Sequence, residues 1–297
     1  MAMKEIVQPA PPQTWKLTLA YDGTDFAGWQ IQPGELTVQG HLQAALGRIS
    51  GESPLPQGSG RTDAGVHALA QVASFLLHAP IPADNLLRAL NRTLPGSIRV
   101  LEAKTVRSTF HARHSAVAKT YEYRIFRDRL CPPFLARYVH HCIWPLDPAK
   151  LDRAAADLIG QQDFFSFAAT DPDQNPAQNP NQSPGESPAQ PPRTSVRAIH
   201  SSAWEHQNTR SGELLIYRVR GNGFLHHMVR NLVGTMLEIG RGQFPADAIP
   251  QILAAHSRSA AGPTAPARGL FLHSVEYDGA DTAESDDSKP DRVPNND

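Results

Sequence analysis

The run GSGRTDAGVHA, residues 58–68, constrains the fold most strongly, because three glycines and little apolar content make it a loop and not a buried element. Glycines on either side of Arg61, Thr62 and Asp63 allow positive φ angles and a close approach of the backbone to a ligand. Asp63 supplies a single carboxylate at the tip of the loop. On local chemistry alone, an Asx turn or a helix cap explains this aspartate better than a catalytic role does.

Regular elements are predicted on both sides of this loop. Residues 16–21 (KLTLAY) alternate polar and apolar side chains, which indicates a strand. A helix is expected over residues 37–51, with a threonine as its N-cap and a glycine at its end. A strand over 71–76, a helix over 82–94 and a strand over 98–103 then follow.

A second series of elements begins with the strongest period-two pattern of the chain, residues 117–126. A helix is expected over 147–159, strands over 196–205 and 214–219, and a helix over 224–239. The two series predict an α/β (or α+β) fold with two similar halves.

The boundaries of these halves follow from composition. We expect a flexible segment over residues 1–14, an N-terminal half over 15–115 that carries the glycine-rich loop, and a C-terminal half over 116–277. Residues 171–192 contain mainly Pro, Asn, Gln and Ser and no large apolar side chain, which predicts a disordered insertion. An acidic, disordered tail is expected over 278–297.

The net charge of −1 hides an asymmetry that bears on binding partners. The tail over 278–297 holds seven acidic and two basic residues, a net charge of −5, so residues 1–277 carry +4. The insertion over 171–192 removes three more negative charges, which leaves +7 on the remaining body. A modestly basic body permits binding of RNA, although it does not require it.

Other features exclude several classes of protein. The hydrophobic share of 40% is typical of a soluble protein, and no apolar run or leader sequence suggests a membrane or secreted protein. Cys131 and Cys142 lack the spacing of a zinc site or a disulfide framework. A cytoplasmic enzyme without metal is therefore expected.

Several segments resemble those of one enzyme family. RTDAGVHA is similar to the catalytic motif of the tRNA pseudouridine synthase family, in its TruA branch. Five further segments resemble that family in the same order along the chain. They are residues 21–39 (YDGTDFAGWQIQPGELTVQ), 110–125 (FHARHSAVAKTYEYRI), 164–167 (FFSF), 221–240 (GNGFLHHMVRNLVGTMLEIG) and 262–277 (GPTAPARGLFLHSVEY).

The resemblance implies a pseudouridine synthase fold, with a mixed, largely antiparallel sheet and an active-site cleft between the halves. It implies isomerisation of uridine to pseudouridine at positions 38, 39 and 40 of the tRNA anticodon stem-loop, by a homodimer without a cofactor. Asp63 matches the catalytic aspartate, acting as nucleophile on the ring or at the ribose. Arg230 matches the basic residue that pairs with it and keeps the carboxylate ionised.

Tyr121 matches the family tyrosine that lies against the target base, where it could stack or accept the C5 proton. It shares one face of its strand with Tyr123, so one of the two can simply pack in the core. A phenol with an ordinary pKa near ~10 is a poor base at neutral pH, which favours stacking.

Further RNA contacts are expected, because the reacting atoms lie inside a paired stem and the base must be flipped out. Arg61 is a candidate for pairing with the aspartate, for binding phosphate or for entering the vacated stack. The other candidates, each of which could equally be an ordinary surface residue, are His67, His111, Arg113 and Lys119.

Three alternatives compete with this interpretation. The first is a catalytically inactive RNA-binding protein of the same fold. The second is a glycosidase, which usually needs two carboxylates where the motif offers one. The third is a metal site at His226 and His227, which we discount because adjacent residues of a helix point about 100° apart.

Overall fold

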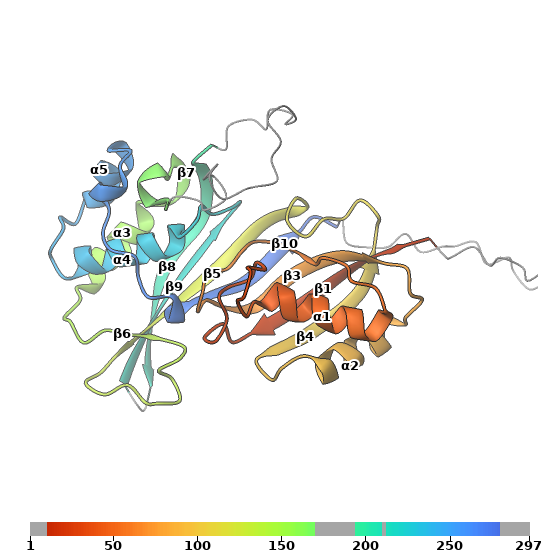
Figure 1. Cartoon of the computed structure of the whole chain (residues 1–297). Coiled ribbons are helices and arrows are strands. Elements are labelled where there is room, and N and C mark those ends of the chain that lie inside the picture. The colour runs from red at the N-terminus through yellow and green to blue at the C-terminus, as the bar shows by residue number, and fades with distance from the viewer. Residues whose placement is uncertain (1–10, 170–193, 210–211, 280–297) are drawn as a thin grey trace, which may run out of the picture.

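The computed structural model describes residues 11–169, 194–209 and 212–279. They build one mixed sheet whose strands lie in the order β4-β1-β3-β10-β5-β9-β8-β7 (Figure 1). Two short strands, β2 and β6, pair with β3 and β5 outside this order. The strands are β1 (Gln13–Tyr21), β2 (Gln57–Gly58), β3 (His67–Leu77), β4 (Ile98–Val106), β5 (Ala116–Arg127), β6 (His140–His141), β7 (Gly160–Asp163), β8 (Val196–Thr209), β9 (Gly212–Gly221) and β10 (Leu270–Tyr277).

Two helices, α1 (Val38–Ser50) and α2 (Ala83–Thr93), accompany the strands of the N-terminal half (Figure 1). The Thr37 side chain accepts a hydrogen bond from the Gly40 amide, as expected of an N-cap. Gly51 ends α1 with φ 75°, a left-handed conformation that suits glycine. The buried faces of both helices join β1, β3 and β4 in the main hydrophobic core.

Three helices lie with the strands of the C-terminal half: α3 (Pro148–Ala156), α4 (Met228–Gly240) and α5 (Ala248–Ala254). Asp147 caps α3, because its carboxylate accepts hydrogen bonds from the amides of residues 149 and 150. Helix α4 is buried on nearly all sides, as its mainly apolar sequence requires. It begins at Met228, four residues later than the predicted start at residue 224.

Strand β10 connects the two halves into one sheet. It pairs in parallel with β3 through only two residue pairs, Phe271 with His67 and Leu272 with Ala68. On its other side it runs antiparallel to β5, from Leu270 opposite Tyr123 to Tyr277 opposite Ala116. All the other strand pairs except β5–β6 are antiparallel, so the predicted α/β fold with a mixed, largely antiparallel sheet is confirmed.

Some predicted features fall at or beyond the limits of the described residues. The insertion over 171–192 and nearly all of the tail over 278–297 lie outside them. Strand β1 starts at Gln13, so it includes the last two residues of the segment 1–14 that was expected to be flexible. Within the described ranges, none of the helices has the length and apolar character needed to cross a membrane.

Candidate active site

The loop over residues 58–68 is held by backbone contacts that only glycine permits. Gly28 has φ 98°, and a Cβ on it would lie 2.5 Å from the carbonyl oxygen of Thr62. That same carbonyl accepts a hydrogen bond of 3.0 Å from the Trp29 amide. The Thr62 hydroxyl is hydrogen-bonded to the buried Tyr21 hydroxyl at 2.8 Å. The residue directly before Asp63 is therefore fixed on both its backbone and its side chain.

The first part of the loop is fixed by a buried glutamine. Gln71, which is fully buried on β3, accepts a hydrogen bond of 2.6 Å from the Ser59 hydroxyl. Its side-chain amide donates to the Gly60 carbonyl at 2.9 Å. Lys119 on β5 donates to the Ser59 carbonyl at 2.6 Å. Burial, reinforced by the nearby Arg113 and Arg197, lowers the pKa of Lys119 to about 8.

Asp63 meets Arg230, which the sequence had placed in a different half of the protein. The Arg230 Nη1 atom lies 2.9 Å from Asp63 Oδ2, and the two side chains are only 15% and 19% exposed. The guanidinium is oriented by a second hydrogen bond of 2.8 Å, from its Nε to the Ala265 carbonyl. A charge-assisted hydrogen bond between partly desolvated groups stabilises the ionised carboxylate.

Tyr121 lies beside this pair, whereas Tyr123 has a structural role. Tyr121 is 8% exposed, and its ring meets Phe224 edge to face with 5.0 Å between the centroids. None of the described residues hydrogen-bonds its hydroxyl. Burial, together with the neighbouring Tyr21 phenol and Asp63 carboxylate, raises the pKa of Tyr121 above its usual value. Tyr123 is fully buried and donates to the Pro266 carbonyl at 2.8 Å.

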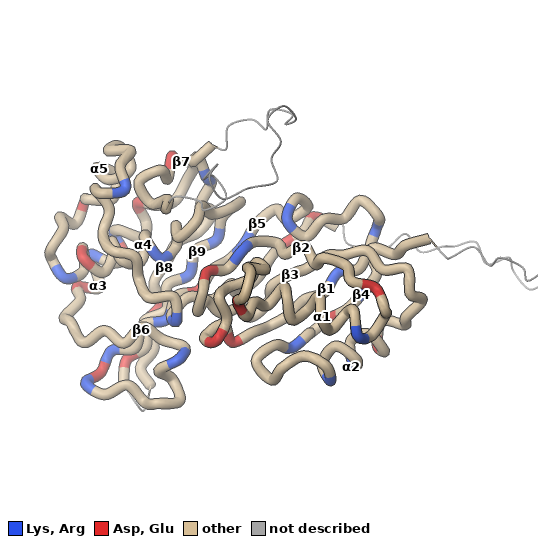
Figure 2. The backbone as a smooth tube through the Cα atoms, in the orientation of Figure 1, with Lys and Arg blue, Asp and Glu red and all other residues tan. Residues whose placement is uncertain are grey.

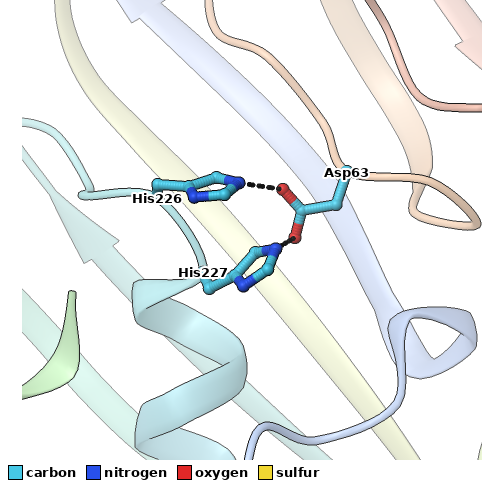
Figure 3. A group of neighbouring side chains, drawn as sticks. All are labelled: Asp63, His226 and His227. Carbon is cyan, nitrogen blue, oxygen red and sulfur yellow. Dashed lines mark ion pairs between the residues drawn. The ribbon is translucent and has the colours of Figure 1, made fainter. Parts of the chain in front are cut away.

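Two histidines that we had discounted also face Asp63 (Figure 3). The Nε2 atoms of His226 and His227 lie 3.6 Å from Oδ1 and 3.3 Å from Oδ2 of Asp63. They stand before the first turn of α4, and His227 has a left-handed backbone with φ 57°. The assumption that both lie on a helix and point apart was wrong, because α4 begins one residue after them.

The expected RNA-binding residues differ in their exposure. Arg61 and Arg113 are exposed, and His111 is half-buried, with a pKa lowered by burial and by the neighbouring His114 and Arg113. His67 is 1% exposed, stacks on Phe271 at 4.7 Å between centroids, and contacts the Arg137 carbonyl through Nε2 at 3.1 Å. This burial leaves His67 no face for RNA and gives it a structural role.

One basic residue near the site was missed in the sequence. Arg197 on β8 is close enough to Lys119 to lower its pKa, and its side chain lies beside Gly223. Basic positions on β5, β8 and β9 flank the centre of the sheet (Figure 2). Arg197 carried no sequence signal, because only the strand pairing brings it near β5.

Sequence comparisons with known proteins give consistent matches. A family model described as tRNA pseudouridine synthase matches residues 18–115 and 154–278. The chain belongs to this family. It is 49% identical over 262 residues to the tRNA pseudouridine synthase A of Solibacter usitatus, with 88% of this chain and 98% of that protein covered. It is 46% identical over 264 residues to the protein of that name from Moorella thermoacetica, with 88% and 98% covered.

The family match includes both segments that meet at the site. Asp63 lies in the first matched region, and Arg230, His226 and His227 lie in the second. The gap in the match, residues 116–153, contains Lys119 and Tyr121. The pseudouridine synthase sheet therefore brings together an anionic loop, a basic helix start and an aromatic strand from segments about 60 to 170 residues apart in sequence.

Proposed function

We propose that this chain isomerises uridine to pseudouridine in tRNA. The observation that carries the proposal is the Asp63–Arg230 contact of 2.9 Å at the predicted catalytic motif, within a chain of the tRNA pseudouridine synthase family. In this reaction the bond between N1 and the ribose C1′ breaks and a bond between C5 and C1′ forms. The proton on C5 leaves and N1 gains a proton, so no oxidant or reductant is required.

Asp63 acts as the nucleophile, either at the ribose or on the uracil ring. Both routes need an ionised carboxylate, and Arg230 supports that state by its direct hydrogen bond. Because only 19% of the Asp63 side chain is exposed, bulk water screens this pair weakly. The loop contacts of Thr62 hold the carboxylate in place before substrate binds.

Tyr121 stacks on the target base in this proposal. Its raised pKa keeps the phenol protonated at neutral pH, which makes it a poor acceptor for the C5 proton. Its ring packs edge to face against Phe224, and its hydroxyl is left for the substrate. Stacking on an aromatic ring offsets part of the cost of removing the uridine from its stem.

Binding of the tRNA involves the exposed and half-buried basic residues around the site. Arg61, His111, Arg113 and Lys119 contact the RNA, and Arg197 extends this surface. Phosphate contacts from these groups position the duplex, while Arg61 enters the stack as the base flips out. A cytoplasmic homodimer acting on positions 38, 39 and 40 of the anticodon stem-loop would add a second basic surface for so large a polyanion.

Release of tritium from tRNA that contains 5-tritiated uridine tests the activity. Wild-type protein is expected to release tritium, and Asp63→Asn, which keeps the shape but not the charge, is expected to release none. Release by wild type no greater than that by Asp63→Asn would contradict the proposed activity and support an RNA-binding protein without activity. Free uracil among the products would instead support a glycosidase.

A map of pseudouridines in tRNA from cells that lack the protein tests the substrate. Loss confined to positions 38, 39 and 40 is expected. Loss only outside the anticodon arm would contradict the proposed substrate while leaving the reaction itself intact.

A further inference from the structure

The group formed by Asp63, His226 and His227 has the donor atoms of a metal site. Two imidazole Nε2 atoms face the two carboxylate oxygens of one aspartate at 3.6 and 3.3 Å (Figure 3). One donor atom from each of the three residues can be chosen so that all lie within 4.8 Å of one another. The distance of 3.6 Å between His226 Nε2 and Asp63 Oδ1 is near the roughly 3.4 Å that separates donors placed about 2.0–2.1 Å from a tetrahedral zinc ion.

The backbone is shaped so that both imidazoles reach the same carboxylate. Successive helical residues point about 100° apart, which would separate the two rings. Here the left-handed conformation of His227, with φ 57°, turns the chain just before α4, and the ring centroids lie 3.9 Å apart. A non-glycine residue in this region carries backbone strain. The surrounding fold therefore stabilises a convergence that the helix itself would not give.

The site is open on one side, and its donor set is selective. The side chains of Asp63, His226 and His227 are 19%, 30% and 29% exposed, so solvent can supply a further ligand. Two neutral imidazoles and one carboxylate suit zinc and cobalt, whereas magnesium and calcium prefer oxygen ligands.

We infer that Asp63, His226 and His227 bind one zinc-type divalent cation and that this cation inhibits the enzyme reversibly. The metal is coordinated by Asp63 Oδ1 and the two Nε2 atoms, while Oδ2 still accepts its hydrogen bond from Arg230. A carboxylate that ligates a metal is no longer free to act as a nucleophile. The positive charge of Arg230 close by opposes the cation, so binding is weaker than in a closed structural zinc site.

Titration of the full chain with Co²⁺, read by its visible absorption in the absence of RNA, tests the site directly. Wild type is expected to bind one equivalent with the absorption of a four- or five-coordinate ion. Loss of supporting contacts alone costs metal sites 10–100-fold in affinity, so the variant His226→Gln/His227→Gln should bind this equivalent at least about 100-fold more weakly. Asp63→Asn should also weaken it.

A second histidine pair provides the matched control. The rings of His111 and His114 lie 4.4 Å apart, but they belong to no three-residue donor group in the described part of the chain. The variant His111→Gln/His114→Gln should still bind one equivalent of Co²⁺ with the affinity of wild type. The proposed metal site is refuted if wild type binds no such equivalent of Co²⁺. It is also refuted if the His226→Gln/His227→Gln protein binds Co²⁺ as tightly as wild type while both proteins show the same thermal unfolding temperature.

Inhibition is tested separately from binding. Zn²⁺ at the concentration that displaces Co²⁺ should abolish tritium release by wild type, and a chelator should restore it. Binding of one equivalent without loss of activity would overturn the inhibitory role. Because the Co²⁺ spectrum does not depend on turnover, a protein that proved inactive on tRNA would still test the site.

Discussion

Replacement of Arg230 by methionine tests the proposed active site most directly. The change removes the hydrogen bond of 2.9 Å to Asp63 and the hydrogen bond of 2.8 Å to the Ala265 carbonyl, while it retains a long apolar stem. Removing one partner of a buried ion pair costs about 3–5 kcal/mol. Because Asp63 keeps some contact with solvent and with two histidines, we take the lower value. If Asp63 acts as proposed, the same loss of support for its charge raises the reaction barrier by about 3 kcal/mol, which lowers kcat/KM roughly 150-fold.

The matched variant Arg230→Lys retains a positive charge but not the planar guanidinium that donates to both Asp63 and the Ala265 carbonyl. It is expected to lose about 1.4 kcal/mol, or roughly tenfold in kcat/KM. Activity is measured by tritium release under single-turnover conditions, with thermal unfolding as the check on folding. Arg241→Met serves as control, because this arginine follows α4 and contacts Glu238 and Trp144 but not Asp63. A folded Arg230→Met protein with activity within about threefold of wild type would refute the reasoning.

Three further predictions concern stability and its pH dependence. In denaturant unfolding, Gly234→Ala should lower the unfolding free energy by at least about 3 kcal/mol, because the new Cβ would lie 1.7 Å from the Pro263 carbonyl oxygen. The control Gly47→Ala should be neutral or stabilising, because its nearest atom would lie 3.5 Å away. Burial lowers the pKa of His140 to about 4, so protonation of this histidine in acid favours the unfolded state. Between pH 7 and pH 4.5 the unfolding free energy of wild type should fall by about 2 kcal/mol more than that of His140→Phe. An equal fall in both proteins would contradict this prediction. The pKa of Lys119 in the folded protein, about 8, lies below its unfolded value, so protonation of Lys119 opposes folding. Between pH 7.5 and 9.5 the unfolding free energy of wild type should therefore rise by about 2 kcal/mol relative to that of Lys119→Met. Parallel curves of unfolding free energy against pH would refute this prediction.

The sequence predicts elements well where their signals are local. Thr37 and Gly51 bound α1 in the structure as they did in the sequence, because capping depends on groups within a few residues. The alternation of side chains along residues 117–126 correctly predicted that Tyr121 and Tyr123 lie on one face of β5. Both tyrosines are buried in the core, and the hydrogen bond that distinguishes Tyr123 is made with Pro266, which lies more than 140 residues further along the chain.

Prediction was poorer at the start of α4, where tertiary contacts override the local pattern. The apolar periodicity includes Phe224 and Leu225, which predicted a helix that begins at residue 224. In the structure His227 instead leaves the helical conformation, and both histidines turn toward Asp63. No propensity scale contains the charge of a carboxylate that lies more than 160 residues away in sequence, so this convergence is visible only in the fold.

The narrow junction between β3 and β10 explains how a loop and a helix from different halves are held in register. Only two residue pairs join these strands, and one of them contains His67, four residues after Asp63. His67 stacks on Phe271, and the Arg124 guanidinium covers the same ring at 4.0 Å. Because β10 also pairs with β5, the strand of Tyr121, a displacement at this junction would move the carboxylate relative to the tyrosine. His67 therefore fixes the end of the loop that carries Asp63 against β10.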